Sequence, residues 1–438
     1  MTWPRRRRLA GLTLARALAA VAAHAQEEPA PTAGAPRAVE PAPTPFDVAA
    51  ARRAYLDRVP AADRERSDAY FEGGYWLQLW SVLWGLGVAW LLLSRRISSR
   101  LRDLAERRSR RPALQTALYA ALYVPLTALL GLPLTLYSDY FREHRYGLSN
   151  QSFGAWSRDQ LVGLAVGVVL ASVLVALLYA VIRRAPRTWW AWGAGVFLLF
   201  FSFTALIAPV FIAPLFNRYQ AVDDPAVAQP ILRLARANGI PAERVYQFDA
   251  SRQSRRISAN VSGFGATMRI SLNDNLLSRC SQAEIESVMG HEMGHYALNH
   301  VYKHLLFFGV VITLGLVFAR WGFERVSRCC GEAWGLRGVS DVAGLPLLAA
   351  LLSVWLFAMT PLLNTWIRSA EAEADLFGIN ASQQPEGFAE VSLKLGEYRK
   401  LDPGPLEEWL LFDHPSGRSR IEMAMRWRAE HPQSPPRP

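Results

Sequence analysis

Six apolar segments interrupt this sequence, and together they decide the class of fold. Most of them approach or exceed the roughly 20 residues that an α-helix needs to cross a bilayer. Charged residues make up only 19% of the chain, below the roughly 25% usual in soluble domains. The sequence therefore predicts a mainly α-helical, multi-pass membrane protein. The segments lie at residues 73–94, 113–137, 161–182, 189–216, 305–319 and 342–367. The run at 305–319 is short, and we expect it to continue the helix that precedes it.

Arginine is concentrated in three of the connections between these segments. Residues 95–111 contain eight Arg, and the connections at 183–187 and 320–337 are also rich in Arg. All three lie on one side if every segment crosses the membrane, and such an excess marks the cytoplasmic side. The other polar regions are therefore predicted to face the periplasm of a bacterial inner membrane, with the cytoplasmic side as the alternative.

The net charge of +11 belongs to this membrane pattern rather than to a nucleic-acid-binding surface. The chain has no basic helix interleaved with aromatic residues and no nucleic-acid-binding motif. We therefore expect membrane lipids, and no nucleic acid, among its partners.

The polar stretch at 217–304 has the pattern of a small α/β region. Its predicted elements are a helix at 226–238 and strands at 245–248 and 268–272, the last with alternating residues that indicate one buried face. Ser281 and Glu284 have the spacing of a capping box, which predicts that a helix begins there. We expect this helix to run through residue 300.

His291, Glu292 and His295 form an H-E-x-x-H motif on that predicted helix. Positions i and i+4 share one helix face, so both imidazoles can bind one tetrahedral zinc ion. Glu292 lies beside them, where a carboxylate can act as general base toward water. The motif predicts a zinc site with one ion per chain.

Zinc in a catalytic site needs a third protein ligand and an open position. An acidic helix follows the last apolar segment, and its Glu371 and Asp375 lie on one face at i and i+4, while Glu373 points elsewhere. Glu371 is the candidate ligand, and Asp375 is the candidate partner that orients a ligand His. From the residues alone, a solvated acidic helix is the alternative.

Two further histidines, His300 and His304, are also spaced i and i+4. We expect a polar role at the membrane surface rather than a second metal site, because no acidic partner is close in sequence.

From about residue 50 to 425 the chain resembles the type I CAAX prenyl protease family of membrane zinc metallopeptidases. The resemblance extends beyond the H-E-x-x-H motif to an E-x-x-x-D element, the gluzincin pattern, and to a downstream His-Pro followed by Arg. Other segments that carry it are 141–156, 207–209, 212–217, 248–251 and 268–274. The resemblance implies that Glu371 is the third zinc ligand and that Asp375 supports the site. It also implies that His414 binds substrate or steadies the tetrahedral intermediate, and that Arg420 assists.

The resemblance implies an endopeptidase that acts on a peptide or protein substrate, either lipid-modified or unmodified. An extended substrate can pair with an exposed strand edge, and we expect the strand near 268–272 to be an edge strand. Met268 and Ile270 are therefore predicted substrate-binding residues, and the resemblance adds Asn260 to them. Alternatives are a quality-control protease of unmodified peptides, a non-peptidase membrane zinc hydrolase and a transporter-like scaffold.

The sequence also predicts how the chain is divided. The expected parts are a signal peptide or N-terminal anchor at 1–25, a disordered Pro/Ala-rich linker at 26–50, a membrane-helix domain of about four spans at 51–216, a metallopeptidase domain at 217–430 interrupted by the spans near 305–319 and 342–367, and a disordered tail at 431–438.

Overall fold

The computed structural model describes residues 46–263 and 268–432. The predicted signal peptide, most of the predicted linker and residues 433–438 of the predicted tail lie outside this part of the chain. The linker prediction extends too far, because helix α1 already begins at Val48. The Asp47 side chain accepts a hydrogen bond from the Ala50 backbone N–H at 2.9 Å and caps that helix.

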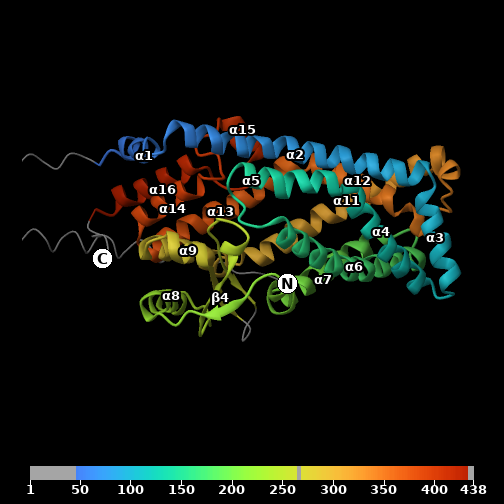
Figure 1. Cartoon of the computed structure of the whole chain (residues 1–438), viewed down its shortest axis with the longest axis horizontal. Helices are drawn as coiled ribbons and strands as arrows, with labels where there is room; N and C mark the ends of the chain where they lie inside the picture. The colour runs from blue at the N-terminus through green and yellow to red at the C-terminus, as the bar shows by residue number, and fades with distance from the viewer. Residues whose placement is uncertain (1–45, 264–267, 433–438) are drawn as a thin grey trace, which may run out of the picture. The chain divides into compact units, whose positions relative to one another are not determined.

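Helices dominate the described chain, and a small sheet lies near the middle of the sequence (Figure 1). The first half contains α1 (Val48–Leu56), α2 (Ala61–Ser94), α3 (Ile97–Arg108), α4 (Pro112–Thr135), η1 (Leu136–Arg142), α5 (Glu143–Arg145), α6 (Phe153–Arg184), α7 (Trp189–Ile207), η2 (Ala208–Ile212) and η3 (Ala213–Leu215). The central part contains β1 (Tyr219–Ala221), α8 (Pro225–Ala237), β2 (Val245–Phe248), η4 (Ala250–Arg252), β3 (Ala259–Ser262), β4 (Arg269–Asn273), α9 (Asp274–Arg279) and α10 (Gln282–Ala297). The last part contains α11 (His300–Trp334), η6 (Val342–Gly344), α12 (Leu345–Ala358), α13 (Thr360–Ser382), α14 (Pro385–Leu395), α15 (Pro405–Leu411) and α16 (Gly417–Glu430).

Five helical stretches in the described chain are long and apolar enough to cross a membrane. They are Ala61–Ser94, Pro112–Arg145, Phe153–Arg184, Trp189–Leu215 and His300–Trp334. The pair Val342–Ala358 and Thr360–Ser382 passes the same test but bends by 58° at its break. Large apolar side chains such as Leu129, Leu199 and Leu306 are exposed along these helices, as expected of surfaces that face lipid. The prediction of a mainly α-helical multi-pass membrane protein is confirmed.

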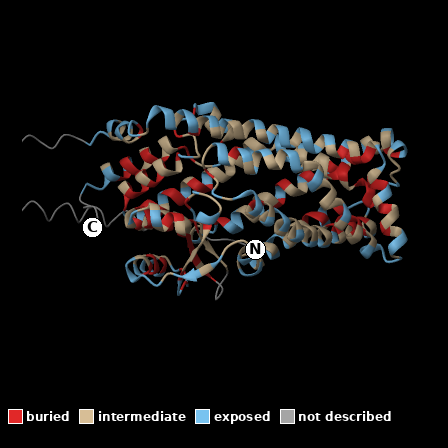
Figure 2. Cartoon of the chain, viewed as in Figure 1, coloured by how far each residue is buried: buried red, intermediate tan, exposed pale blue. Residues whose placement is uncertain are grey.

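Buried residues gather toward the two ends of this helix bundle, and the middles of the long helices are mostly intermediate or exposed (Figure 2). One end contains α3 and the end of α11. The other end contains the sheet with α8, α9, α14 and α16. The predicted site residues lie toward the second end.

The Arg-rich connections are more ordered than the sequence suggested. Residues 97–108 form α3, and α11 continues to Trp334, so most of the 320–337 connection is helical. Arg102 pairs with Asp341 at 2.5 Å, and both side chains are buried. Asp341 also accepts a hydrogen bond from the Ala343 backbone N–H at 3.0 Å. The sequence does not reveal this order, because these contacts join residues far apart in the chain.

The helix that carries the H-E-x-x-H motif begins as predicted and ends earlier. Ser281 and Glu284 form the capping box at its start. It stops at Ala297, and Asn299 adopts a left-handed conformation with φ of 57°, which Asn tolerates better than most residues. The apolar run at 305–319 therefore belongs to a new helix, α11, rather than to a continuation of α10.

The sheet has the order β1-β2-β4-β3, so β4 is a central strand. It pairs with β2 in parallel and with β3 antiparallel. Ile270, Ser271 and Leu272 are all fully buried, which means that both faces of the strand are covered. The prediction of an edge strand with one buried face near 268–272 was wrong. Alternation shows that a strand exists but does not say how many neighbours it has.

Helices α10 and α13 approach each other to backbone contact, and this contact brings the two halves of the site together. A Cβ added at Gly290 would lie 2.7 Å from the Gly378 carbonyl oxygen, and one added at Gly378 would lie 2.6 Å from the His291 backbone nitrogen. Gly294 and Ala374 make a second close approach, at 3.1 Å from the added Cβ to the Ala374 Cα. Small residues at these positions let the motif helix lie directly on the acidic helix.

Candidate metal centre and active site

Three side chains from α10 and α13 converge on one point. His291 Nε2 lies 3.2 Å from His295 Nε2 and 3.3 Å from Glu371 Oε2. His295 Nε2 lies 3.4 Å from Glu371 Oε1. These residues form a group in which each offers one ligand atom within 4.8 Å of the others. The structure thus brings together all three predicted metal ligands.

The spacing of these donor atoms suits a small tetrahedral metal ion. Zinc bonds to His nitrogen and carboxylate oxygen are about 2.0–2.2 Å long, so the ligand atoms of a tetrahedral site are about 3.3–3.5 Å apart. The two histidine Nε2 atoms are 3.2 Å apart, and each lies 3.3–3.4 Å from one oxygen of the Glu371 carboxylate, so every contact is close to this spacing. Two nitrogens and one oxygen also form the donor set of a catalytic zinc site.

Asp375 holds the first histidine in place. Its Oδ1 accepts a hydrogen bond from His291 Nδ1 at 2.7 Å, which leaves Nε2 directed at the other two ligands. Its Oδ2 accepts a hydrogen bond from Arg420 Nε at 2.8 Å. Arg420 Nη2 also lies 3.3 Å from Glu371 Oε2. Asp375 is fully buried and Arg420 is 6% exposed, so this pair orients two predicted ligands from inside the protein.

The second histidine is oriented by residues that the sequence analysis did not assign to the site. His295 Nδ1 lies 2.9 Å from Nδ1 of His300, which is buried. His300 Nε2 lies 3.1 Å from Glu373 Oε2, and Lys303 Nζ lies 2.7 Å from the same oxygen. When Nε2 of His295 is a metal ligand, its Nδ1–H donates to His300, and His300 donates to Glu373. His300 has no acidic partner close in sequence, as noted above, but Glu373 supplies one from 73 residues away.

Burial and nearby charge set the protonation of the site. Burial lowers the pKa of His291, but its hydrogen bonds with Asp375 and Glu371 outweigh this effect and raise the pKa to about 10. Burial raises the pKa of the Glu292 carboxyl, and the neighbouring His291 and His295 oppose that rise. A metal ligand must give up its proton, so a divalent ion held by His291, His295 and Glu371 would supply the positive charge that the His291 proton supplies without it.

His414 reaches the centre from the loop between α15 and α16. Its Nε2 lies 3.3 Å from Glu371 Oε2, and its Nδ1 lies 2.7 Å from Asp413 Oδ1. The α13 helix fixes this loop, because Arg368 Nη1 donates to the Glu408 carbonyl at 2.7 Å and Asn364 Nδ2 donates to the Leu410 carbonyl at 3.0 Å. The same helix therefore carries Glu371 and positions His414.

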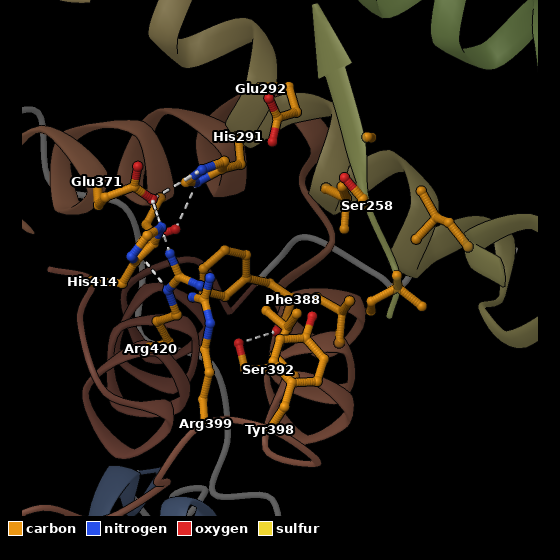
Figure 3. A pocket seen from close by; sticks show the side chains of 17 residues that line it. Ser258, His291, Glu292, Glu371, Phe388, Ser392, Tyr398, Arg399, His414 and Arg420 are labelled. Atoms are coloured by element: carbon orange, nitrogen blue, oxygen red, sulfur yellow. Dashed lines mark hydrogen bonds and ion pairs between the residues drawn. The ribbon is translucent and has the colours of Figure 1, made fainter. Parts of the chain in front are cut away.

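A cavity of about 170 Å³ opens beside the centre (Figure 3). Polar residues on its walls are Ser258, His291, Glu292, Glu371, Asp375, Ser392, Tyr398, Arg399, His414 and Arg420. Glu292 and His291 extend from α10, with the Glu371 carboxylate beside the His291 ring and His414 beside Glu371. The cavity thus joins the predicted base, the predicted ligands and the His-Pro element in one space.

The predicted substrate-binding residues are not all at this cavity. Met268 and Ile270 are buried in the hydrophobic core that joins the sheet to α8 and α10, so neither presents a side-chain surface to a peptide. Asn260 lies on β3, opposite Ser271 of β4. β3 is the outer strand of the sheet beyond β4, and its first residue, Ala259, lines the cavity.

Comparison with known proteins agrees with this architecture. Residues 51–218 match the family model described as CAAX prenyl protease N-terminal, five membrane helices, and residues 221–428 match peptidase family M48. The chain is 32% identical over 313 residues to an uncharacterized metalloprotease, YhfN, of Bacillus subtilis, covering 71% of this chain and 73% of the relative. It is 27% identical over 307 residues to a CAAX prenyl protease 1 homolog of Oryza sativa, covering 69% and 71%. The crystal structure of S. mikatae Ste24p has the same fold, with a TM-score of 0.71, 20% identity and coverage of 84% of this chain and 90% of that one.

The chain therefore belongs to peptidase family M48, in the group that carries the CAAX prenyl protease membrane helices. It is an integral membrane metalloendopeptidase of a family whose metal is typically zinc. The predicted family, enzyme class and membrane location are confirmed at this level.

Proposed function

We propose that His291, His295 and Glu371 bind one zinc ion per chain, and that the protein hydrolyses peptide bonds in the adjoining cavity. The observation that carries this proposal is the convergence of two histidine nitrogens, 3.2 Å apart, with the Glu371 carboxylate, whose two oxygens lie 3.3–3.4 Å from them, on two packed helices. Asp375 and His300 support it, because each lies behind one of the two histidines. Such outer partners orient metal ligands and raise their basicity.

Zinc bound at these ligands supplies Lewis acidity, which polarises the scissile carbonyl and makes water acidic near neutral pH. Glu292 receives the proton of the attacking water and delivers it to the leaving amine. Its partly buried position favours this double role, because burial raises its pKa and so makes the protonated form accessible after the first transfer.

His414 and Arg420 take different parts in this proposal. The His414 imidazole lies on the cavity wall 3.3 Å from Glu371, where its Nε2–H can donate to the oxyanion that develops on the substrate carbonyl. Arg420 is already hydrogen-bonded to Asp375, so it acts by holding Asp375 and Glu371 in position. This division makes His414 a catalytic residue and Arg420 a positioning residue.

The proposed substrate is an extended peptide or protein segment, lipid-modified or unmodified. β3 offers the backbone edge next to the cavity, so pairing with substrate is assigned to β3 and its Asn260 rather than to β4. Several relatives are named CAAX prenyl proteases, which favours a lipid-modified substrate. A quality-control role on unmodified peptides is the second candidate. The exposed apolar side chains of the long helices place the protein in the membrane, where it can meet either kind of substrate.

The metal and the reaction can be tested together on purified, detergent-solubilised protein. We expect about one zinc per chain by elemental analysis and cleavage of members of an unbiased peptide library. A chelator should abolish cleavage, and added zinc should restore it. Matched prenylated and unprenylated peptides then distinguish the two substrate classes. Protein without bound metal after zinc loading would refute the metal site, and zinc-loaded protein that cleaves no peptide of either class would refute the peptidase proposal.

We also propose a domain division and an orientation. A membrane-helix domain at 51–216 and a metallopeptidase domain at 217–430 are supported by the two family-model matches. The catalytic end faces the periplasm of a bacterial inner membrane, because the Arg-rich α3 end lies at the opposite end of the bundle (Figure 1).

The native Cys329 provides a test of orientation, because it is exposed near the Arg-rich end of α11. A membrane-impermeant maleimide should label it only after cells are permeabilised. A cysteine introduced at exposed Gln220 on β1, with the native cysteines replaced by Ser, should be labelled in intact spheroplasts. The reverse pattern would place the catalytic end in the cytoplasm.

A further inference from the structure

Arg399 lines the active-site cavity but takes no part in the metal centre. It lies in the segment between α14 and α15, and Figure 3 shows its side chain beside that of Arg420. Its Nη1 atom is buried, and no group in residues 46–263 or 268–432 forms a hydrogen bond with that atom. Arg399 is therefore a guanidinium at the cavity wall with an unused buried donor.

The carboxylates around Arg399 are engaged elsewhere. Asp413 lies 2.7 Å from His414 Nδ1. Glu371 is contacted by His291, His414 and Arg420. Burial and the charge of Arg420 lower the pKa of Arg399, and Tyr398, Asp413 and Glu371 oppose this only in part. The Arg399 charge is thus incompletely compensated by its protein surroundings.

A buried charged donor without a partner is unfavourable, and such a group in a folded protein calls for a specific explanation. A guanidinium binds carboxylates especially well, because its planar set of N–H groups matches their two oxygens. Arg420 cannot serve an incoming anion in the same way, because its Nε is bonded to Asp375. Arg399 is the guanidinium in this cavity that retains binding capacity.

We propose that Arg399 forms a subsite for a carboxylate of the substrate, either the α-carboxylate at the chain end or an Asp or Glu side chain. This inference rests on the proposed peptidase function and adds a substrate preference to it. Arg399 and the proposed base Glu292 line the same small cavity, and an extended peptide advances roughly 3.3–3.6 Å per residue. The preferred carboxylate therefore lies only a few residues from the cleaved bond.

Three peptides that share one cleavable sequence test the subsite. The first ends in a free carboxylate two residues beyond the cleaved bond, the second ends in an amide, and the third is amidated but has Glu as its last residue. We expect the wild-type protein to cleave the first or the third with a kcat/KM about ten- to hundredfold above the second, as for loss of a charge-assisted hydrogen bond. Whichever of the two is preferred identifies the source of the carboxylate.

Arg399→Gln should remove this preference by slowing only the carboxylate peptides, and Arg399→Lys should restore part of it. Arg426→Gln, which removes the same charge from an exposed position on α16, should leave the preference unchanged. Equal cleavage of all three peptides by wild type, or an equal loss on all three in Arg399→Gln, would overturn the subsite while leaving the peptidase intact. If wild type cleaves none of the peptides, their affinities for zinc-loaded Glu292→Gln protein are measured instead. Equal affinities for all three peptides, or no binding of any, would overturn the subsite.

Discussion

Replacing Glu292 with Gln should lower kcat for peptide cleavage by about 10²–10⁴-fold, the usual contribution of a general acid–base group. Gln has nearly the same shape but cannot accept the proton of the attacking water. Glu292 is not among the three residues whose ligand atoms converge, so zinc content should stay at the wild-type value. The measurement pairs single-turnover cleavage with elemental analysis on the same preparation.

Glu286→Gln is the matched control for this experiment. Glu286 lies earlier on the same helix, α10, and its carboxylate accepts a hydrogen bond from Gln282 at 3.0 Å rather than lining the cavity. Its replacement removes the same charge and should change kcat by less than about threefold, because surface changes away from the site have small effects. A Glu292→Gln protein that turns over at the wild-type rate with zinc bound would show that another group is the base.

The predictable part of the site is the part that depends on the spacing of residues within one helix. His291 and His295 share a helix face because the capping box at Ser281 begins that helix and four residues make about one turn. Both imidazoles could therefore be assigned to one metal without knowledge of the fold. The role of Glu371 could not be assigned in this way, because the residues alone fit both a metal ligand and a solvent-exposed acidic side chain. Its contact with the histidines depends on the close approach of α10 and α13 at Gly290 and Gly378, which no local pattern specifies.

The residues that were missed depend on tertiary contacts. His300 lies next to His295 because the helix breaks at Asn299, which has a left-handed conformation, whereas in a continuous helix positions i and i+5 lie on different faces. Glu373 faces away from Glu371 on α13, as the helix period requires, yet this direction brings it to His300. The central position of β4 likewise results from its pairing with both β2 and β3. Sequence periodicity predicts which face of an element a side chain lies on, but it does not predict which residues of other elements contact that face.

Asp375→Asn tests whether the buried pair behind the centre serves the metal or only the fold. The change leaves Arg420 with a neutral partner in a buried position. Removing one member of a buried pair typically destabilises a protein by about 3–5 kcal/mol. Loss of the carboxylate behind His291 should also weaken zinc binding by about 10–100-fold. Thermal unfolding in detergent and zinc competition with a chelator measure the two effects separately.

A double variant separates these effects, because stability and metal affinity respond to different features of Asp375. Combining Asp375→Asn with Arg420→Met removes the charge that has lost Asp375, and apolar replacement of a buried ion pair is often neutral for stability. We expect thermal stability without metal to recover toward wild type while zinc affinity stays low, because His291 still lacks its carboxylate. Glu390→Gln, which breaks the exposed Arg58 pair, should cost less than about 1 kcal/mol and leave zinc binding unchanged. Wild-type zinc affinity in Asp375→Asn would show that Asp375 stabilises the fold without orienting the metal ligand.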